Sequence, residues 1–107
     1  MPENIQKVLR ELKQGLQRLY GDQLQAVILF GSYARGDARP PDSDIDVMIV
    51  LKGEFDHWAM KKISSEFVAD LCLEYDVVIS WFFVSDHEYL NSKTPFMLNV
   101  RDDAVVI

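Results

Sequence analysis

Two carboxylates, Asp44 and Asp46, stand one residue apart, directly before the apolar run 47–51. In an extended strand alternate side chains share a face, so the two carboxylates converge while Ile45 points to the other face. Like charges this close raise the pKa of at least one partner unless a cation compensates them. Magnesium suits such a pair, because it takes oxygen ligands and shares them with substrate phosphates. The pattern predicts a magnesium site, although a single Asp-x-Asp triplet is more often a solvated strand end.

A phosphate-binding turn is predicted just before this pair. The apolar run 25–30 ends at Gly31, and Ser32 follows as a good helix N-cap. A glycine lets a phosphate approach the backbone closely, and a serine hydroxyl and free N–H groups can donate to it. Arg35 and Arg39 add positive charge nearby. An isolated Gly-Ser pair usually marks a plain capped turn, so its significance here comes from the carboxylate pair that follows.

A third acid, Asp76, heads the apolar run 77–84, which is typical of another strand. If that strand pairs beside the one with Asp44 and Asp46, three carboxylates could share one or two metal ions for in-line phosphoryl transfer. Glu74 is the alternative third ligand, two residues earlier on the same side of the strand. Asp76 is favoured because it begins the apolar run more directly. A strand-start acid that faces water is the other interpretation.

The remaining segments are predicted to build the scaffold. Apolar residues recur at helical spacing over 5–19, and Gly21 follows where a helix often stops. A second helix is expected over 56–73, a third from Thr94-Pro95, and a short closing strand over 104–107. The apolar side of the second helix is expected to comprise Trp58, Ile63, Phe67, Val68 and Leu71.

Length and charge limit the possible classes of protein. A chain of 107 residues is predicted to form one domain, 1–107, with a core of its own. It has no apolar run of membrane-spanning length and no signal pattern, and its one cysteine fits a reducing compartment, so a cytoplasmic location is expected. A net charge of −6 argues against direct nucleic-acid binding, which needs a basic surface.

The motif Gly31-Ser32, followed by Asp44-x-Asp46 and the later Asp76, resembles the nucleotidyltransferase superfamily of DNA polymerase beta. Because the chain has room for the core alone, it is similar to minimal nucleotidyltransferases of the MntA type. The resemblance runs from about residue 25 to the C-terminus. It implies an α/β (α+β) fold, a polymerase-beta-like core with a small mixed β-sheet flanked on one face by helices.

The resemblance also implies an activity. Minimal nucleotidyltransferases are commonly antitoxins that transfer AMP from ATP to a tyrosine of a HEPN-domain ribonuclease toxin, often within a hetero-oligomeric complex. We therefore expect Mg²⁺, as two ions, with ATP as the donor. The expected catalytic and metal-binding residues are Asp44, Asp46 and Asp76, and the expected nucleotide-binding residues are Gly31, Ser32, Arg35 and Arg39.

Two alternatives stay open. A small-molecule nucleotidyltransferase, such as one that modifies an antibiotic, would share the motif but normally needs an added acceptor-binding domain. A non-catalytic antitoxin would neutralise its partner by contact, with Trp81, Phe83 and the helical faces as the interface. Nucleotide consumption would separate these functions.

Overall fold

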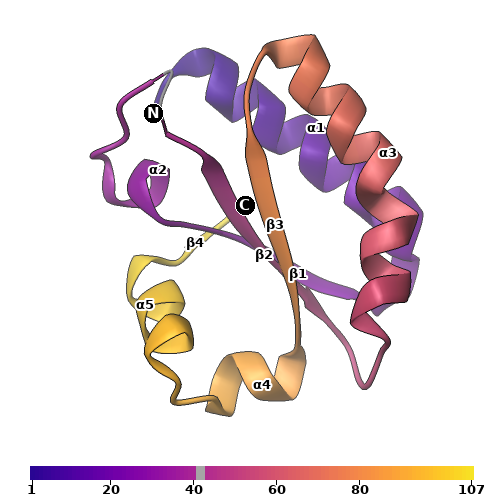
Figure 1. The fold of residues 1–107 in the computed structure, drawn as a ribbon. Coiled ribbons are helices and arrows are strands. Elements are labelled where there is room, and N and C mark those ends of the chain that lie inside the picture. The colour runs from indigo at the N-terminus through magenta and orange to yellow at the C-terminus, as the bar shows by residue number, and fades with distance from the viewer. Residues whose placement is uncertain (41–42) are drawn as a thin grey trace.

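The computed structural model describes residues 1–40 and 43–107. Strands alternate with helices along most of the chain (Figure 1). The elements are α1 (Glu3–Tyr20), the 3₁₀-helix η1 (Gly21–Gln23), β1 (Leu24–Phe30), α2 (Ser32–Arg35), β2 (Ile45–Leu51), α3 (His57–Tyr75), β3 (Ile79–Ser85), α4 (Asp86–Asn91), α5 (Pro95–Asp103) and β4 (Val105–Val106).

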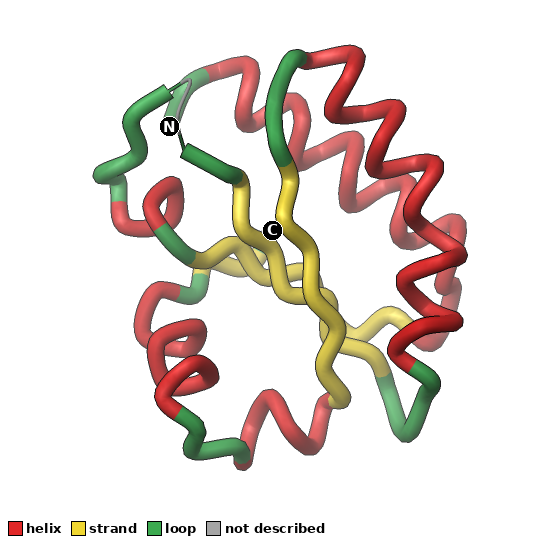
Figure 2. The backbone as a smooth tube through the Cα atoms, in the orientation of Figure 1, coloured by secondary structure: helices red, strands yellow, loops and turns green. Residues whose placement is uncertain are grey.

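The four strands form one mixed sheet in the order β3-β2-β1-β4. β1 pairs antiparallel with both β2 and β4, whereas β2 and β3 are parallel neighbours joined by α3. The predicted mixed sheet is therefore confirmed, as is the pairing of the third strand beside the one that carries Asp46. Figure 2 shows α2 and the loops on either side of it connecting the end of β1 to the start of β2.

Helices cover both faces of this sheet, whereas the predicted fold has helices on one face. α1 and α3 lie together on one face, and α4 and α5 lie on the other (Figure 1). The core beneath α1 and α3 includes Leu12, Leu16, Val27, Leu29, Val47, Ile49, Val68 and Leu71. The core beneath α5 includes Ile28, Phe30, Met48, Val50, Val84, Met97 and Val100. β1, β2 and β3 thus alternate their side chains between two cores.

The caps confirm the predicted C-terminus of α1 and the predicted starts of α3 and α5, whereas α3 ends at Tyr75 and not at residue 73 as predicted. α1 ends at Gly21, whose φ is +56°. The Asp56 carboxylate caps α3 by accepting from the backbone N–H of Trp58 at 3.0 Å, and the Thr94 hydroxyl caps α5 by accepting from the N–H of Met97 at 3.2 Å. Side-chain caps satisfy backbone donors that no helical carbonyl can reach.

The apolar side of α3 is narrower than the sequence predicted. Trp58 and Ile63 were expected to be buried but are 76% and 46% exposed. The buried stripe instead follows Ser64, Val68 and Leu71, spaced by four and three residues. Trp58 and Ile63 lie off this stripe, because one residue turns a helix by roughly 100°.

The packing of α1 on α3 supplies a stability prediction. A Cβ added to the buried Gly15 would lie 2.0 Å from Cζ of Phe67. We expect Gly15→Ala to lower the free energy of unfolding by about 1–3 kcal/mol, because the overpacked ring must move. That loss outweighs the gain in helix propensity, which is about 1 kcal/mol. Urea unfolding measures the change, and an equally stable variant would show that the helices separate without cost.

Candidate active site

The two halves of the sequence motif meet at one end of the sheet. Phe30 and Asp46 are paired residues of β1 and β2, so Gly31 follows directly beside Asp46. A Cβ built on Gly31 would lie 2.4 Å from Oδ2 of Asp46. The backbone of the turn therefore lies against the carboxylate, and a side chain there would occupy the space of the Asp46 carboxylate.

Asp44 and Asp46 repel one another in this position. Burial raises the pKa of the Asp46 carboxyl, the negative charge of Asp44 raises it further, and the positive charge of Arg35 opposes both effects. The net shift of the Asp46 pKa is upward, so the positive charge of Arg35 does not fully compensate the negative charges of Asp44 and Asp46. Two oxygen-rich side chains with uncompensated charge provide a place for a cation.

The turn itself differs from the prediction in one detail. Gly31, not Ser32, is the N-cap of α2, and its φ of 78° and ψ of −157° lie in a region that is essentially restricted to glycine. Ser32 is instead the first residue of the helix, and no side chain caps this helix. The chain can leave β1 and enter α2 at once because of that glycine conformation.

An acid that the sequence analysis missed lies at the turn. Oδ2 of Asp103, near the end of α5, accepts from the Gly31 N–H at 3.3 Å and from Nη1 of Arg35 at 2.8 Å. Arg35 also pairs with Asp37 at 3.3 Å. An acid in the last turn of a helix is unfavourable for the helix dipole, and that signal could have drawn attention to Asp103 in the sequence.

The Asp103 carboxylate occupies the place beside the Gly31 N–H and Arg35 that a bound phosphate would need. We expect Asp103→Ala to lower the KM for ATP severalfold, because the Gly31 N–H and the Arg35 guanidinium would no longer be shared with a carboxylate. Steady-state kinetics with a fixed acceptor measures this effect. A raised KM would show instead that Asp103 holds Arg35 in its binding position.

The structure places Asp76 and Glu74 outside the strand. β3 begins at Ile79, so the prediction that Asp76 heads this strand is wrong: Asp76 is the C-cap of α3, with a φ of 52°. Its N–H donates to the carbonyl of Cys72, and its side chain lines a hollow with Tyr33 and Ser43. Glu74 lies in the last turn of α3, not on the strand as its alternative role required.

No third acid joins the pair within residues 1–40 and 43–107. In these ranges no group of three or more His, Cys, Asp or Glu side chains is placed to hold a metal ion. The residue beside Asp46 in β3 is Ser80, and its hydroxyl donates to Oδ2 of Asp44 at 3.3 Å. The carboxylate pair is thus flanked by a neutral hydroxyl, which the sequence analysis did not single out.

Arg39 lies in an exposed part of the loop between α2 and β2. Its backbone N–H donates to the Ser43 hydroxyl at 2.8 Å. The structure gives this contact for Arg39, and its role in nucleotide binding stays a prediction.

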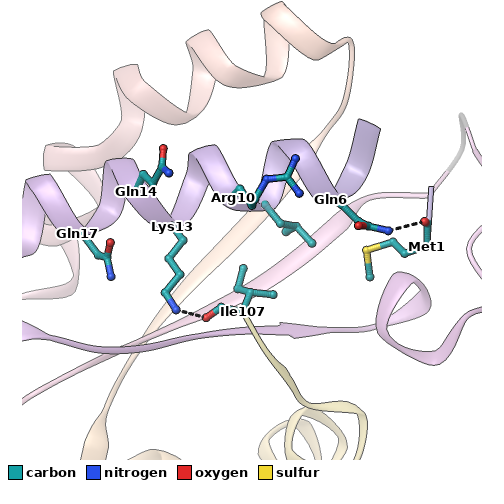
Figure 3. A pocket seen from close by; sticks show the side chains of 8 residues that line it. Met1, Gln6, Arg10, Lys13, Gln14, Gln17 and Ile107 are labelled. Atoms are coloured by element: carbon teal, nitrogen blue, oxygen red, sulfur yellow. Dashed lines mark hydrogen bonds between the residues drawn. The ribbon is translucent and has the colours of Figure 1, made fainter. Parts of the chain in front are cut away.

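An apolar hollow lies beside α1. Figure 3 shows it between α1 and Ile107, with Lys13 donating to the Ile107 carbonyl. Its lining residues are Met1, Gln6, Leu9, Arg10, Lys13, Gln14, Gln17 and Ile107. None of the residues predicted to do chemistry belongs to it.

Comparison with known proteins agrees with this geometry. The family described as "Nucleotidyltransferase domain" matches residues 9–100 of the chain. The chain belongs to this nucleotidyltransferase family. The predicted family and enzyme class are therefore confirmed, and the match includes both the turn at Gly31 and the pair Asp44 and Asp46.

Two relatives of this nucleotidyltransferase come from Methanocaldococcus jannaschii. One, named "Putative protein adenylyltransferase MJ0604", is 36% identical over 97% of this chain and 98% of its own length. The other, named "Putative protein adenylyltransferase MJ0141", is 38% identical over 71% of this chain and 75% of its own length.

Solved structures confirm the fold of the nucleotidyltransferase. One titled as a putative nucleotidyltransferase from Sulfolobus solfataricus has a TM-score of 0.59 at 24% identity and covers 99% of this chain and 86% of its own. A toxin–antitoxin with AMP-PNP has a TM-score of 0.58 at 22% identity, with 96% and 68% covered. At these identities the likeness supports the fold alone.

Proposed function

We propose that this nucleotidyltransferase transfers AMP from ATP to a hydroxyl group of a partner protein. The observation that carries the proposal is the packing of the Gly31 turn against Asp46, with Asp44 beside it. This arrangement offers backbone N–H groups and paired carboxylates at one point, which are the groups that phosphoryl transfer from a nucleotide requires. The two relatives named as protein adenylyltransferases support a protein as the acceptor.

Magnesium fits the donor set of this site. Asp44 and Asp46 supply hard oxygen ligands, and the raised pKa of the Asp46 carboxyl indicates charge that Arg35 does not fully compensate. Magnesium is commonly held by one or two carboxylates together with substrate phosphates, so a third carboxylate is not needed. When bound, the ion would neutralise charge on the phosphates. The proposed ligands are Asp44 and Asp46, and Asp76 stays a predicted third ligand that the structure places at a helix end.

The residues of the chain would bind and orient the two reactants. The Gly31 N–H and the Ser32 hydroxyl would receive the terminal phosphates of ATP, with Arg35 beside them. The acceptor oxygen then forms a bond to the α-phosphorus while the bond from that phosphorus to the pyrophosphate oxygen breaks. Pyrophosphate leaves over the turn, and the hydroxyl proton passes to water.

We also propose a finer identity for the partner. We infer that the acceptor is a tyrosine of a cognate HEPN-family toxin, that the chain is its antitoxin in a hetero-oligomer, and that both act in the cytoplasm. Structural neighbours that are toxin–antitoxin complexes, one titled with AMP-PNP, support this assignment. Across residues 1–40 and 43–107, no helix combines the length and the apolar character that a bilayer crossing needs.

Radiolabel transfer tests the proposal. The purified chain is incubated with Mg²⁺, α-labelled ATP and the HEPN-domain protein encoded beside it, and label on that protein is measured. We expect label with the wild-type chain and none with the Asp44→Asn, Asp46→Asn double variant. A stable complex that carries no label in either case would favour neutralisation by contact alone.

Magnesium is also expected to stabilise the fold in a pH-dependent way. Since the pKa of Asp46 is raised in the folded protein, the native state keeps this proton to a higher pH than the unfolded chain. Stability is therefore lost as the pH rises from the ordinary carboxyl pKa through the raised value, and a bound cation restores it there. Thermal melting should show stabilisation by Mg²⁺ near neutral pH that fades as the pH falls through the raised pKa. Equal stabilisation of the double variant would contradict the assigned ligands.

A further inference from the structure

Two exposed aromatic rings lie on the β3 side of the carboxylate pair. Along β3, Ser80 pairs with Asp46 and Phe82 pairs with Met48, so both side chains share the sheet face of Asp46. Phe82 is 42% exposed, and Phe96 at the start of α5 is 47% exposed. We refer to Phe82 and Phe96 as the aromatic pair.

Both rings of the aromatic pair pack against a buried ring of the core. The ring centroids of Phe82 and Phe96 are 5.7 Å apart, and the buried ring of Phe30 lies beneath both, at 6.0 Å and 5.9 Å. Phe96 meets both other rings edge to face, and the rings of Phe30 and Phe82 are tilted by 49°, which are favourable arrangements of aromatic pairs. Exposed apolar groups held rigidly beside a polar site are typical of ligand recognition.

The order of the strands suggests that ATP and the acceptor hydroxyl approach the site from different sides. The turn at Gly31 follows β1, and β3 lies on the other side of β2. In phosphoryl transfer the attacking and leaving oxygens are roughly in line on opposite sides of the phosphorus. If pyrophosphate leaves over Gly31, the attacking hydroxyl arrives from the β3 side, past Ser80 and Phe82.

We propose that Phe82 and Phe96 are specificity-determining residues that select an acceptor hydroxyl carried on an aromatic ring. This inference rests on the proposed function and adds the location of the acceptor. The incoming ring packs against the aromatic pair, which positions its oxygen beside Asp44 and Asp46. That oxygen bonds to the α-phosphorus, the bond to the pyrophosphate oxygen breaks, and the hydroxyl proton passes to water. Ser80 donates to Asp44 and is itself uncharged, and the Lys61 ammonium lies 5.8 Å from the centroid of the Phe82 ring.

The test compares two small acceptors, N-acetyl-tyrosinamide and N-acetyl-serinamide, with α-labelled ATP and Mg²⁺. The wild-type chain should favour the tyrosine compound in kcat/KM. Phe82→Ala and Phe96→Ala should each reduce that preference about tenfold, the size of an aromatic-pair energy of about 1.4 kcal/mol. The KM for ATP should stay near the wild-type value, since ATP is expected to bind on the Gly31 side of the site.

Controls separate the inference from the proposed function. Leu73→Ala removes a still more exposed apolar side chain, 83% exposed, from α3 in the opposite layer, and it should leave the preference unchanged. Thermal melting confirms that the truncated variants fold. If Phe82→Ala and Phe96→Ala keep the full wild-type preference for the tyrosine compound, the inference is overturned and the proposed function is not. No transfer to either compound or to a partner protein would overturn both.

Discussion

Asp46→Asn is expected to reduce AMP transfer about a thousandfold or more, the scale seen when one preorganised electrostatic group is lost from an active site. Asn keeps the size of the side chain but removes the charge that the proposed cation would need as a ligand. Because the pKa of Asp46 is raised in the fold, losing its charge should not lower stability at neutral pH. Label transfer and thermal melting on the same sample give both quantities.

Asp76→Asn is the matched control for this experiment. Asp76 ends α3 with a positive φ, a conformation that Asn tolerates as well as Asp. The variant therefore keeps the helix end and removes the same charge. Transfer close to the wild-type rate would assign the chemistry to Asp44 and Asp46, whereas a loss as large as that of Asp46→Asn would make Asp76 the third ligand after all.

Gly31→Ala is expected to abolish transfer and to destabilise the fold. The new Cβ would lie 2.4 Å from Oδ2 of Asp46, and the φ of 78° is itself strained for any L side chain. Strain of this kind costs about 1–3 kcal/mol, and the displaced carboxylate loses its position at the phosphate turn. Chemical unfolding and label transfer measure the two effects.

Gly36→Ala separates the effect of backbone strain from the effect of displacing the Asp46 carboxylate. Gly36 has a similar φ of 83°, but no atom lies within 4 Å of its built Cβ. We expect a comparable loss of stability with most of the activity retained. If both variants retained activity, the contact between the turn and Asp46 would have no catalytic role.

Local sequence signals were sufficient for the parts of the site that depend on neighbouring residues. Alternation placed Asp46 on the face opposite Ile45, and Thr94-Pro95 fixed the start of α5. These features follow from strand periodicity and from capping chemistry within a few residues. The turn at Gly31 was predicted for the same reason.

Features that depend on tertiary packing were not predicted. The contact between Asp103 and Gly31 joins residues 72 positions apart, and only the docking of α5 creates it. The short helix α4, capped by the Ser85 hydroxyl, was missed because its six residues carry little apolar periodicity. Asp76 was misplaced because the apolar run 77–84 does not show where α3 ends and β3 begins.

The most direct test of the central claim is the mass of the partner protein after incubation with the chain, ATP and Mg²⁺. We expect a tyrosine-containing peptide of the HEPN-domain protein to gain the mass of one AMP with the wild-type chain. The same peptide should stay unmodified with Asp46→Asn. Modification that persists with Asp46→Asn, or a partner neutralised without any added mass, would contradict the account.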